Sequence, residues 1–311
     1  MRSLLVFNPF ATSTNDATKK QIVEQLSDQL DLTVHPTTSR GEATQIATNA
    51  TLQGFDVIIG YGGDGTMNEI ANGLLHNGPN ISGPILGALP GGNANVFARN
   101  LEFSANPIEA TQQLVDSINN QRTKTIGVGR LDTDELTRWF LFNSGFGIDA
   151  AVLAKMDERR QNGKRVTDNM YTALAIQELL AESAQRDTSI SLRTPSDEEF
   201  DDLRFALVIN LAPWIYIGER PITLTPNATM DKALSVYALA DLSVSGLVQL
   251  ARNLFGKRVP ETNNRQLALA DQKSVTFESK KPLWVQVDGE ALSKVTRVQM
   301  SHVANALRVF A

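Results

Sequence analysis

The sequence predicts an α/β fold in which an N-terminal doubly wound parallel sheet is followed by a mostly antiparallel β-sandwich. Strand and helix patterns alternate through the first 122 residues, as in a parallel sheet covered by helices. From residue 123 onward, short strand candidates are separated by turn residues, which is typical of an antiparallel sandwich or barrel. With 311 residues the chain is long enough for about two domains, and we place them at 1–122 and 123–311.

In the first part, apolar periodicity defines each element in turn. Strands are expected at 4–7, 32–37, 55–61 and 84–89, and helices at 16–30, 41–52, from Thr66 onward, at 95–101 and at 106–120. The last helix has the clearest start, because Asn106 can cap it, Pro107 suits its first turn and Glu109 follows.

In the second part, alternating apolar residues predict short strands. The candidates lie at 123–131, 138–147, 188–194, 203–211, 221–225, 233–240, 273–279, 282–290, 294–300 and 306–311, and two helical stretches lie near 149–182 and 243–255.

Composition excludes several classes of site. The chain has no cysteine and three histidines, so thiolate zinc sites, disulfides and cysteine nucleophiles are impossible. A net charge of -5 gives no support to a nucleic-acid partner. No apolar run approaches the roughly 20 residues that cross a bilayer, and the start is expected to be a strand rather than a signal peptide. We therefore expect a cytoplasmic protein without a transmembrane segment.

A glycine-rich loop, GYGGDGT, joins the strand at 55–61 to a helical pattern. Thr66 and Glu69 have the spacing of a capping box, so the helix is expected to begin there. Free backbone N–H groups and the positive end of the helix dipole would then face a loop bare enough for a phosphate. Asp64 would meet such an anion through a cation such as Mg²⁺, or would cap the loop itself.

Several segments together are similar to the diacylglycerol kinase catalytic-domain family. GGDGTMNE resembles its GGDGT-x-x-E signature, which is also partly shared with NAD kinases. Further matches occur in family order along nearly the whole chain and favour the lipid kinases: FNPF, TTSRGEA, LGALPGGNANVFAR, FNSGFGIDAAV, TPNATMDKALSV and VQVDGEAL.

The resemblance implies ATP- and Mg²⁺-dependent phosphorylation of a lipid hydroxyl, most simply that of diacylglycerol. It implies catalytic roles for Asp288, Glu290 and Asp64, and a metal held by Asp231 with the carbonyls of Ala228 and Ala233. The nucleotide-binding residues it implies are Asn8, Pro9, Phe10, Ala11, Thr12, Thr37, Gly62, Gly63, Asp64, Gly65, Thr66, Met67, Asn68, Glu69, Gly92, Asn93 and Asn95.

The chemistry is consistent with these roles. An alcohol nucleophile needs a carboxylate within hydrogen-bond reach to accept its proton. Asp288 follows a strand pattern and precedes Gly289, so without the resemblance the pair would be interpreted as a hairpin turn. The sequence does not separate Asp288 from Glu290 as the base, and turn or cap contacts are the simpler interpretation of Asn143 and Asp149.

Four departures from the family pattern bear on the site, and the first is that the FNPF loop lacks its usual glycine next to the expected ATP site. Asn93 replaces the usual threonine, which alters a predicted phosphate contact. Val96 replaces an aspartate and removes a polar group. Lys232 follows Asp231 where the family has glycine, which brings a cation to the predicted metal site.

Two stretches suit an anionic membrane surface, because they combine apolar and basic residues. They are SGLVQLARNLFGKR, with Leu247, Val248, Leu250, Ala251, Leu254, Phe255, Lys257 and Arg258, and KMDERRQNGKR, with Lys155, Arg159, Arg160, Lys164 and Arg165. The alternative is that the first is a core-packing helix and the second a solvated one. Transient membrane association and a homodimer formed through strand edges are further expectations.

Two other functions remain open from the sequence. A NAD kinase-like enzyme shares the glycine loop but does not account for LPGGNANVFAR or VDGE. A non-catalytic nucleotide- or lipid-binding regulator would explain the changes at Asn93 and Lys232 through lost activity.

Overall fold

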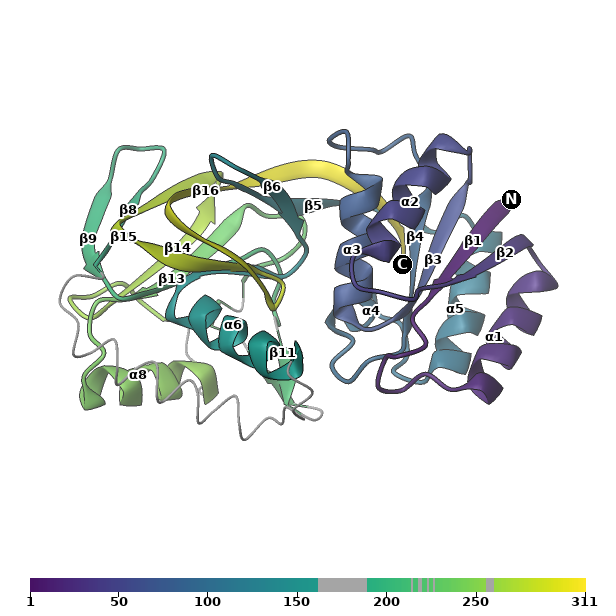
Figure 1. Ribbon diagram of the computed structural model, residues 1–311, viewed down its shortest axis with the longest axis horizontal. Helices are drawn as coiled ribbons and strands as arrows, with labels where there is room; N and C mark the ends of the chain where they lie inside the picture. Colours follow the sequence, from purple (N-terminus) through teal and green to yellow (C-terminus); the bar gives the residue numbers. More distant parts are fainter. Residues whose placement is uncertain (162–188, 214, 218–219, 223, 226, 256–259) are drawn as a thin grey trace. The chain divides into compact units, whose positions relative to one another are not determined.

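The chain folds into two compact units. A computed structural model describes all residues except 162–188, 214, 218–219, 223, 226 and 256–259 (Figure 1). Met1–Val128 and Ala304–Ala311 belong to the first unit, and most of the chain between them forms the second. The division at residue 122 stays a prediction, and residues 304–311 of the predicted second domain group with the first unit.

The first unit contains the predicted parallel sheet. Its strands follow the order β2-β1-β3-β4, every neighbouring pair is parallel, and the end of β16 adds a further parallel strand beside β4. The strands are β1 Arg2–Phe7, β2 Asp31–Pro36, β3 Val57–Gly62 and β4 Ile85–Pro90. The central strands β3 and β4 are buried along their whole length, as expected for a sheet covered on both faces.

Helices cover both faces of this sheet. In Figure 1, α1 and α5 lie on one face and α2 and α3 on the other, and each pair packs together. The helices are α1 Asp16–Ser27, α2 Glu42–Leu52, α3 Asp64–Leu74, α4 Val96–Asn100 and α5 Pro107–Asn119. Asn106 caps α5 through the amides of Ile108 and Glu109, as its sequence predicts. This confirms the doubly wound arrangement.

The strand order creates a switch point in the first unit. The chain leaves β1 toward β2 on one side and later returns to β3 on the other. In open parallel sheets, ligands bind at such a point, outside the carboxyl ends of the strands. The loops after β1, β3 and β4 all begin at this edge of the sheet.

The second unit is mostly antiparallel, with the strand order β14-β13-β10-β7-β15-β16 and with β8 and β9 extending from β15. The elements from residue 123 onward, of which β5, β11 and β16 lie partly in the first unit, are β5 Thr123–Asp132, β6 Thr137–Phe140, β7 Asn143–Gly147, α6 Ile148–Gln161, β8 Ile190–Arg193, β9 Glu199–Leu203, β10 Phe205–Ile209, β11 Ile215–Ile217, β12 Arg220–Ile222, β13 Leu234–Leu239, α8 Val244–Phe255, β14 Gln266–Gln272, β15 Ser274–Val287 and β16 Glu290–Phe310.

Both faces of the central strands of this unit are buried. In β10, Ala206 and Val208 belong to one apolar cluster, whereas Leu207 and Ile209 belong to a second one that includes side chains of α6. This alternation follows from the two-residue period of a strand.

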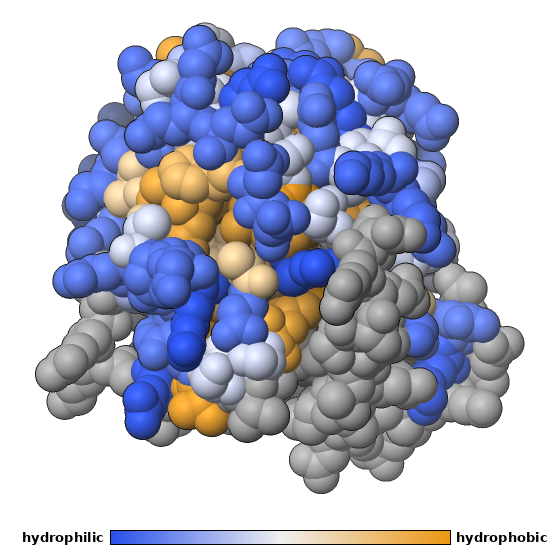
Figure 2. Space-filling view, turned by 90° about the vertical axis from the view of Figure 1, so that its left-hand side faces the viewer, coloured by the Kyte–Doolittle hydropathy of each residue, from blue (hydrophilic) through white to orange (hydrophobic). Residues whose placement is uncertain are grey.

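The face seen in Figure 2 is largely hydrophilic, with hydrophobic residues showing between the polar ones.

Several predicted elements differ from those observed. Residues 294–300 and 306–311, predicted as two strands, lie in the single long strand β16, and residues 138–147 split into β6 and β7. The strands β9, β11 and β14 were not predicted, because acidic or short apolar stretches carry little periodic signal. Of the predicted helix at 149–182, residues 162–182 lie outside the described residues.

Gly73 makes the close packing of α2 and α3 possible. A Cβ at this position would collide with the carbonyl oxygen of Thr44 and lie 2.7 Å from the Cβ of Ala47. We expect Gly73→Ala to lower the free energy of unfolding by about 1–3 kcal/mol, because the helices must move apart. Chemical denaturation measures this loss. The control is Gly65→Ala in the same helix, where a Cβ meets nothing within 4 Å; equal losses in both variants would contradict the explanation.

Candidate functional site

At the carboxyl edge of the first sheet, three loops hydrogen-bond through their backbones. The N–H group of Asn8 donates to the Tyr61 carbonyl at 3.0 Å, and that of Gly91 donates to Gly62 at 2.9 Å. The N–H group of Ser13 donates to Gly91 at 2.9 Å. These bonds hold the loops after β1, β3 and β4 together.

The glycines of two of these loops face each other without side chains between them. A Cβ on Gly91 would lie 2.9 Å from the Cα of Gly62, and a Cβ on Gly92 would lie 2.7 Å from the Cα of Gly63. Contacts this short with backbone atoms cannot be relieved by a side-chain rotation. Glycine is therefore required by the packing of the loops at these positions.

Gly65 differs from its neighbours, because a Cβ there would meet nothing within 4 Å. It is exposed and lies in the first turn of α3. The fold does not require glycine at this position, whereas a ligand that approaches the backbone does. The first N–H groups of a helix also lack partners within the helix and attract anions. This place therefore has the features of a phosphate-binding site.

Asp64 holds the next loop. Its carboxylate accepts the N–H groups of Val96 and Phe97, both at 3.0 Å, and so caps the start of α4. Burial raises the pKa of Asp64 above its ordinary value, and the two amide hydrogen bonds and nearby Arg99 oppose that effect. The sequence left two roles for Asp64: contact with a phosphate through a cation, or a cap of its own loop. These contacts favour a capping role, but Asp64 caps α4 and not its own loop.

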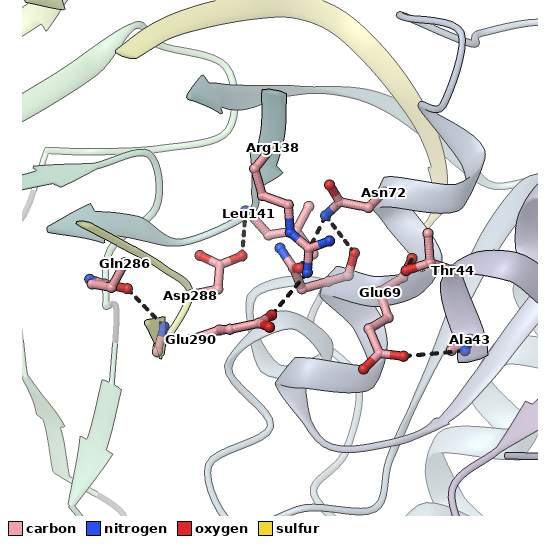
Figure 3. A network of polar contacts seen from close by, with 11 residues as sticks. Ala43, Thr44, Glu69, Asn72, Arg138, Leu141, Gln286, Asp288 and Glu290 are labelled. Atoms are coloured by element: carbon pink, nitrogen blue, oxygen red, sulfur yellow. Dashed lines mark hydrogen bonds and ion pairs between the residues drawn. The ribbon is translucent and has the colours of Figure 1, made fainter. Parts of the chain in front are cut away.

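The predicted capping box is wrong. The helix α3 begins at Asp64 with Gly63 as N-cap, so Thr66 lies inside its first turn. The Thr66 hydroxyl accepts the side-chain amide of Asn8 at 3.3 Å. The Glu69 carboxylate instead accepts the N–H group of Ala43 at 3.2 Å, at the start of α2 (Figure 3). Tertiary packing of α2 on α3 gives Glu69 this partner.

The loop after β4 is held by one asparagine. Asn95, at a φ of 48°, accepts the N–H group of Gly92 and donates to its carbonyl, both at 2.8 Å. These bonds use both ends of its side-chain amide for loop structure. Asn93 is exposed on the same loop. Of the two predicted asparagines on this loop, Asn93 is the one with an exposed side chain.

The other predicted nucleotide residues divide into exposed and buried ones. Phe10 is 80% exposed after β1, where Pro9 and Thr12 are also exposed and Ala11 is half-buried. Thr37 is buried, and its N–H group donates to Phe7 at 2.9 Å. Met67 and Asn68 are buried within α3, so their side chains belong to the interior of the unit.

In the second unit, the VDGE segment forms a two-residue hairpin turn between β15 and β16. Val287 pairs with Glu290, and Asp288 and Gly289 between them have φ values of 47° and 84°. Two central residues with positive φ define the type I′ turn that Asp-Gly favours. The hairpin interpretation of this dipeptide is thus confirmed.

The carboxylate of Asp288 is tied to the segment between β6 and β7. One oxygen accepts the N–H group of Leu141 at 2.7 Å (Figure 3), and the other accepts those of Phe142 and Asn143 at 2.9 Å. A carboxylate has about four lone-pair positions, and these three backbone amides occupy three of them. The turn therefore presents a carboxylate of fixed orientation.

Glu290 has a different environment from Asp288. Its carboxylate forms an ion pair with the guanidinium group of Arg138 on β6, with 2.9 Å between Nη2 and Oε2 (Figure 3). The two side chains are 31% and 24% exposed. Arg138 was not singled out from the sequence, because nothing in its local pattern distinguishes it from a surface arginine.

A buried amide connects this turn with β7 and α6. Gln286 accepts the N–H group of Gly289 at 3.0 Å and donates to Asn143 at 2.7 Å and to Asp149 at 3.0 Å. Asn143 and Asp149 thus make turn contacts, as the simpler interpretation had it. Gln286 was missed because a glutamine beside two valines in a strand is normally an exposed residue.

The predicted metal ligands Asp231, Ala228 and Ala233 have different surroundings. Asp231 is exposed, and the carbonyl of Ala228 accepts the N–H group of Ala212 at 3.1 Å. The N–H group of Ala233 donates to Asp271 at 3.2 Å. Within the described part of the chain, no group of three or more His, Cys, Asp or Glu residues could hold a metal ion. Because Mg²⁺ usually keeps several waters and binds through one or two carboxylates, a metal held by Asp231 and carbonyls stays a prediction.

The stretches predicted to reach a membrane are only partly described. Val248 on α8 is 47% exposed, and Lys155 on α6 is exposed. Lys164, Arg165, Lys257 and Arg258, and the side chains of Leu247, Ala251, Leu254, Phe255 and Arg160, lie outside the described residues. No helix in the described ranges is long and apolar enough to span a membrane.

Known proteins resemble this chain both in sequence and in fold. Residues 2–131 match the model of the diacylglycerol kinase catalytic domain. A diacylglycerol kinase of Bacillus subtilis (strain 168) is 36% identical over 135 residues, which is 42% of each chain. One from Staphylococcus saprophyticus is 23% identical and covers 93% of this chain and 88% of its own. The predicted resemblance to the diacylglycerol kinase catalytic-domain family is confirmed.

Solved structures share the fold of nearly the whole chain. A diacylglycerol kinase from Bacillus anthracis str. Sterne matches with a TM-score of 0.71 at 22% identity, over 99% of this chain and 96% of that one. An NAD kinase from Archaeoglobus fulgidus, solved in complex with ATP, matches with a TM-score of 0.51 at 13% identity, over 100% and 94%. The α/β class with a parallel and an antiparallel part is confirmed.

The cap formed by Asp64 can be tested by its removal. We expect Asp64→Ala to lower the free energy of unfolding by about 1–2 kcal/mol, because two amides at the start of α4 lose their acceptor. Asp64→Asn, which keeps one acceptor oxygen, is expected to lose less. The matched control is Asp16→Ala in the first turn of α1, where the carboxylate is fully exposed. Equal losses at both positions in chemical denaturation would refute the capping role.

Proposed function

We propose that the protein is an ATP-dependent lipid kinase that converts diacylglycerol to phosphatidic acid. The observation that carries this proposal is the VDGE turn, whose carboxylate is oriented by three amides, on a chain that also has an open glycine loop at a helix start. Relatives named diacylglycerol kinase or lipid kinase support the same assignment.

The first unit is proposed to bind the nucleotide. Its phosphates would lie against the start of α3 at Gly65, where the backbone is open and the helix dipole favours negative charge. Exposed Asn93 and the loop from Asn8 to Thr12 border the same edge of the sheet. Phe10 offers a broad apolar surface there, which suits a nucleotide base.

The second unit is proposed to supply the base. Asp288 accepts the proton of the lipid hydroxyl, the hydroxyl oxygen bonds to the γ-phosphorus, and the bond from that phosphorus to the leaving ADP oxygen breaks. Asp288 is the better candidate because three backbone amides hold its carboxylate in a fixed direction. Glu290 is engaged by Arg138 and is assigned to holding that guanidinium group.

Mg²⁺ is proposed only as the usual companion of ATP, whose phosphate charge it neutralises. A second ion held by Asp231 with the carbonyls of Ala228 and Ala233 stays a prediction, and no step of the reaction is assigned to it. Transient contact with a membrane, where the lipid substrate resides, and a homodimer stay predictions.

The base assignment predicts a large loss of turnover in one variant. We expect Asp288→Asn to lower kcat by about 10²-fold or more, with little change in the KM for ATP, because proton acceptance is lost while the nucleotide loop is unaltered. Radiolabelled ATP and dioctanoylglycerol in mixed micelles provide the assay. Glu290→Gln serves as comparison and is expected to lose less.

Other outcomes of the same assay distinguish other functions. Wild-type turnover in Asp288→Asn would end the assignment of the base. Phosphate transfer to NAD instead of lipid would favour an NAD kinase-like enzyme. Binding of ATP without transfer to any lipid or to NAD would favour a regulator.

The nucleotide assignment predicts that bulk at Gly65 weakens ATP binding. Gly65→Val is expected to raise the Kd for ATP about tenfold, because the added methyl groups occupy the space where phosphates approach the backbone. Isothermal titration with ATP measures the change. The control is Ala17→Val, which places the same side chain at the equivalent exposed position of α1. An unchanged Kd in Gly65→Val would refute this phosphate site.

A further inference from the structure

Gln286 is a buried residue that the proposed reaction does not use directly. The residue is 1% exposed, and its side chain accepts the N–H group of Gly289 in the Asp288–Gly289 turn (Figure 3). It contacts three places far apart in the sequence: the turn itself, Asn143 at the start of β7, and Asp149 in the first turn of α6. Such a residue can control the arrangement of the groups around the base.

The contacts of Gln286 determine which end of its amide points where. The N–H group of Gly289 can only donate, so the end that it meets at 3.0 Å is the oxygen. The other end is therefore the nitrogen, and it lies 3.0 Å from a carboxylate oxygen of Asp149, which suits a donor. Hydrogen-bond partners are the means by which the two ends of a side-chain amide are told apart.

The orientation of Gln286 in turn determines that of Asn143. The Gln286 nitrogen lies 2.7 Å from Asn143, so the Asn143 side chain must present its oxygen there. Its own nitrogen then points away from the network. That nitrogen has no acceptor among the residues that the structure describes, and it is not one of the fully buried unpaired atoms. Asn143 is 6% exposed, and its two N–H donors are directed away from Gln286.

These donors belong to a residue that also holds the base. The backbone N–H group of Asn143 donates to the Asp288 carboxylate at 2.9 Å, and its carbonyl accepts the N–H group of Asp288 at 2.9 Å. A substrate hydroxyl that reaches Asp288 therefore arrives beside the Asn143 side chain. The acceptor lipid carries oxygen atoms next to its hydroxyl that can accept a hydrogen bond.

We propose that Gln286 is a positioning residue that turns the N–H donors of Asn143 toward the acceptor lipid, where they bind an oxygen next to or at the reacting hydroxyl. The inference rests on the proposed lipid kinase function. Gly145 is consistent with it, because a Cβ there would lie 2.8 Å from Asp149 Oδ2 and 3.0 Å from Gln286 Nε2. Glycine at this position leaves the space that the amide network occupies.

Two variants remove the outward N–H groups of the Asn143 side chain in different ways. Asn143→Asp keeps an oxygen toward Gln286 but replaces the outward N–H group by a second oxygen. Gln286→Glu keeps the acceptor for Gly289 but cannot donate to Asn143, so the Asn143 amide must turn round. Each is expected to raise the KM for dioctanoylglycerol in mixed micelles about tenfold, which corresponds to one lost hydrogen bond, without changing the KM for ATP.

The double variant separates positioning from general damage. Because both single changes remove the same N–H contact, their effects on the lipid KM are expected not to add. The matched control is Asn263→Asp, since Asn263 is exposed in the loop before β14 and its oxygen accepts the N–H groups of Arg265 and Gln266. This control is expected to keep the wild-type lipid KM. Thermal unfolding reports whether each variant is folded.

A second substrate identifies the oxygen that is bound. With the dialkyl ether analogue of dioctanoylglycerol, the wild-type KM rises if Asn143 binds an ester carbonyl. The wild-type KM stays the same if Asn143 binds the hydroxyl. Either result supports the contact, provided that Asn143→Asp raises the KM for dioctanoylglycerol. An unchanged lipid KM in folded Asn143→Asp and Gln286→Glu would overturn this inference alone. Absence of lipid phosphorylation by the wild-type protein would overturn it together with the proposed function.

Discussion

The direct contact of backbone on backbone between the loops after β3 and β4 is the constraint on which the first unit's candidate site depends. Gly62 faces Gly91, and Gly63 faces Gly92. There is no space for a Cβ on Gly91 or on Gly92. Because the loops approach this closely, the start of α4 comes within reach of the Asp64 carboxylate. Packing thus accounts for glycine at Gly91 and Gly92, whereas at Gly65 the fold leaves space for a side chain and a bound ligand would favour glycine.

The two acidic residues of the motifs are held in the same physical way. Asp64 and Asp288 each accept backbone N–H groups from a segment distant in the sequence. Backbone amides are suitable partners, because they are positioned by the fold and do not change with side-chain rotation. Each acid therefore connects two loops of its own unit, and a proposed chemical role has to use the lone pairs that remain.

In the second unit, the carboxylate of Asp288 and the side-chain amide of Gln286 are both held in fixed orientations next to the same turn. Asp288 is held by the segment Leu141–Asn143, and that segment is itself held by the buried side chain of Asn210, which donates to the Leu141 carbonyl at 3.0 Å. Gln286 fixes the turn from the other side. Buried and paired polar groups of this kind specify one arrangement, because an unpaired group in the interior is costly.

Local sequence alone determined the parallel sheet, the glycine loop at the end of β3 and the Asp-Gly turn. Each depends on periodicity or on the φ values that two or three adjacent residues allow. Tertiary structure decided the partners: Glu69 meets Ala43 instead of its own helix start, Asp64 meets Val96, and Asp288 meets Leu141. Hydrogen bonds between segments depend on how helices and loops pack. The local preferences of the chain do not determine which distant segments come into contact.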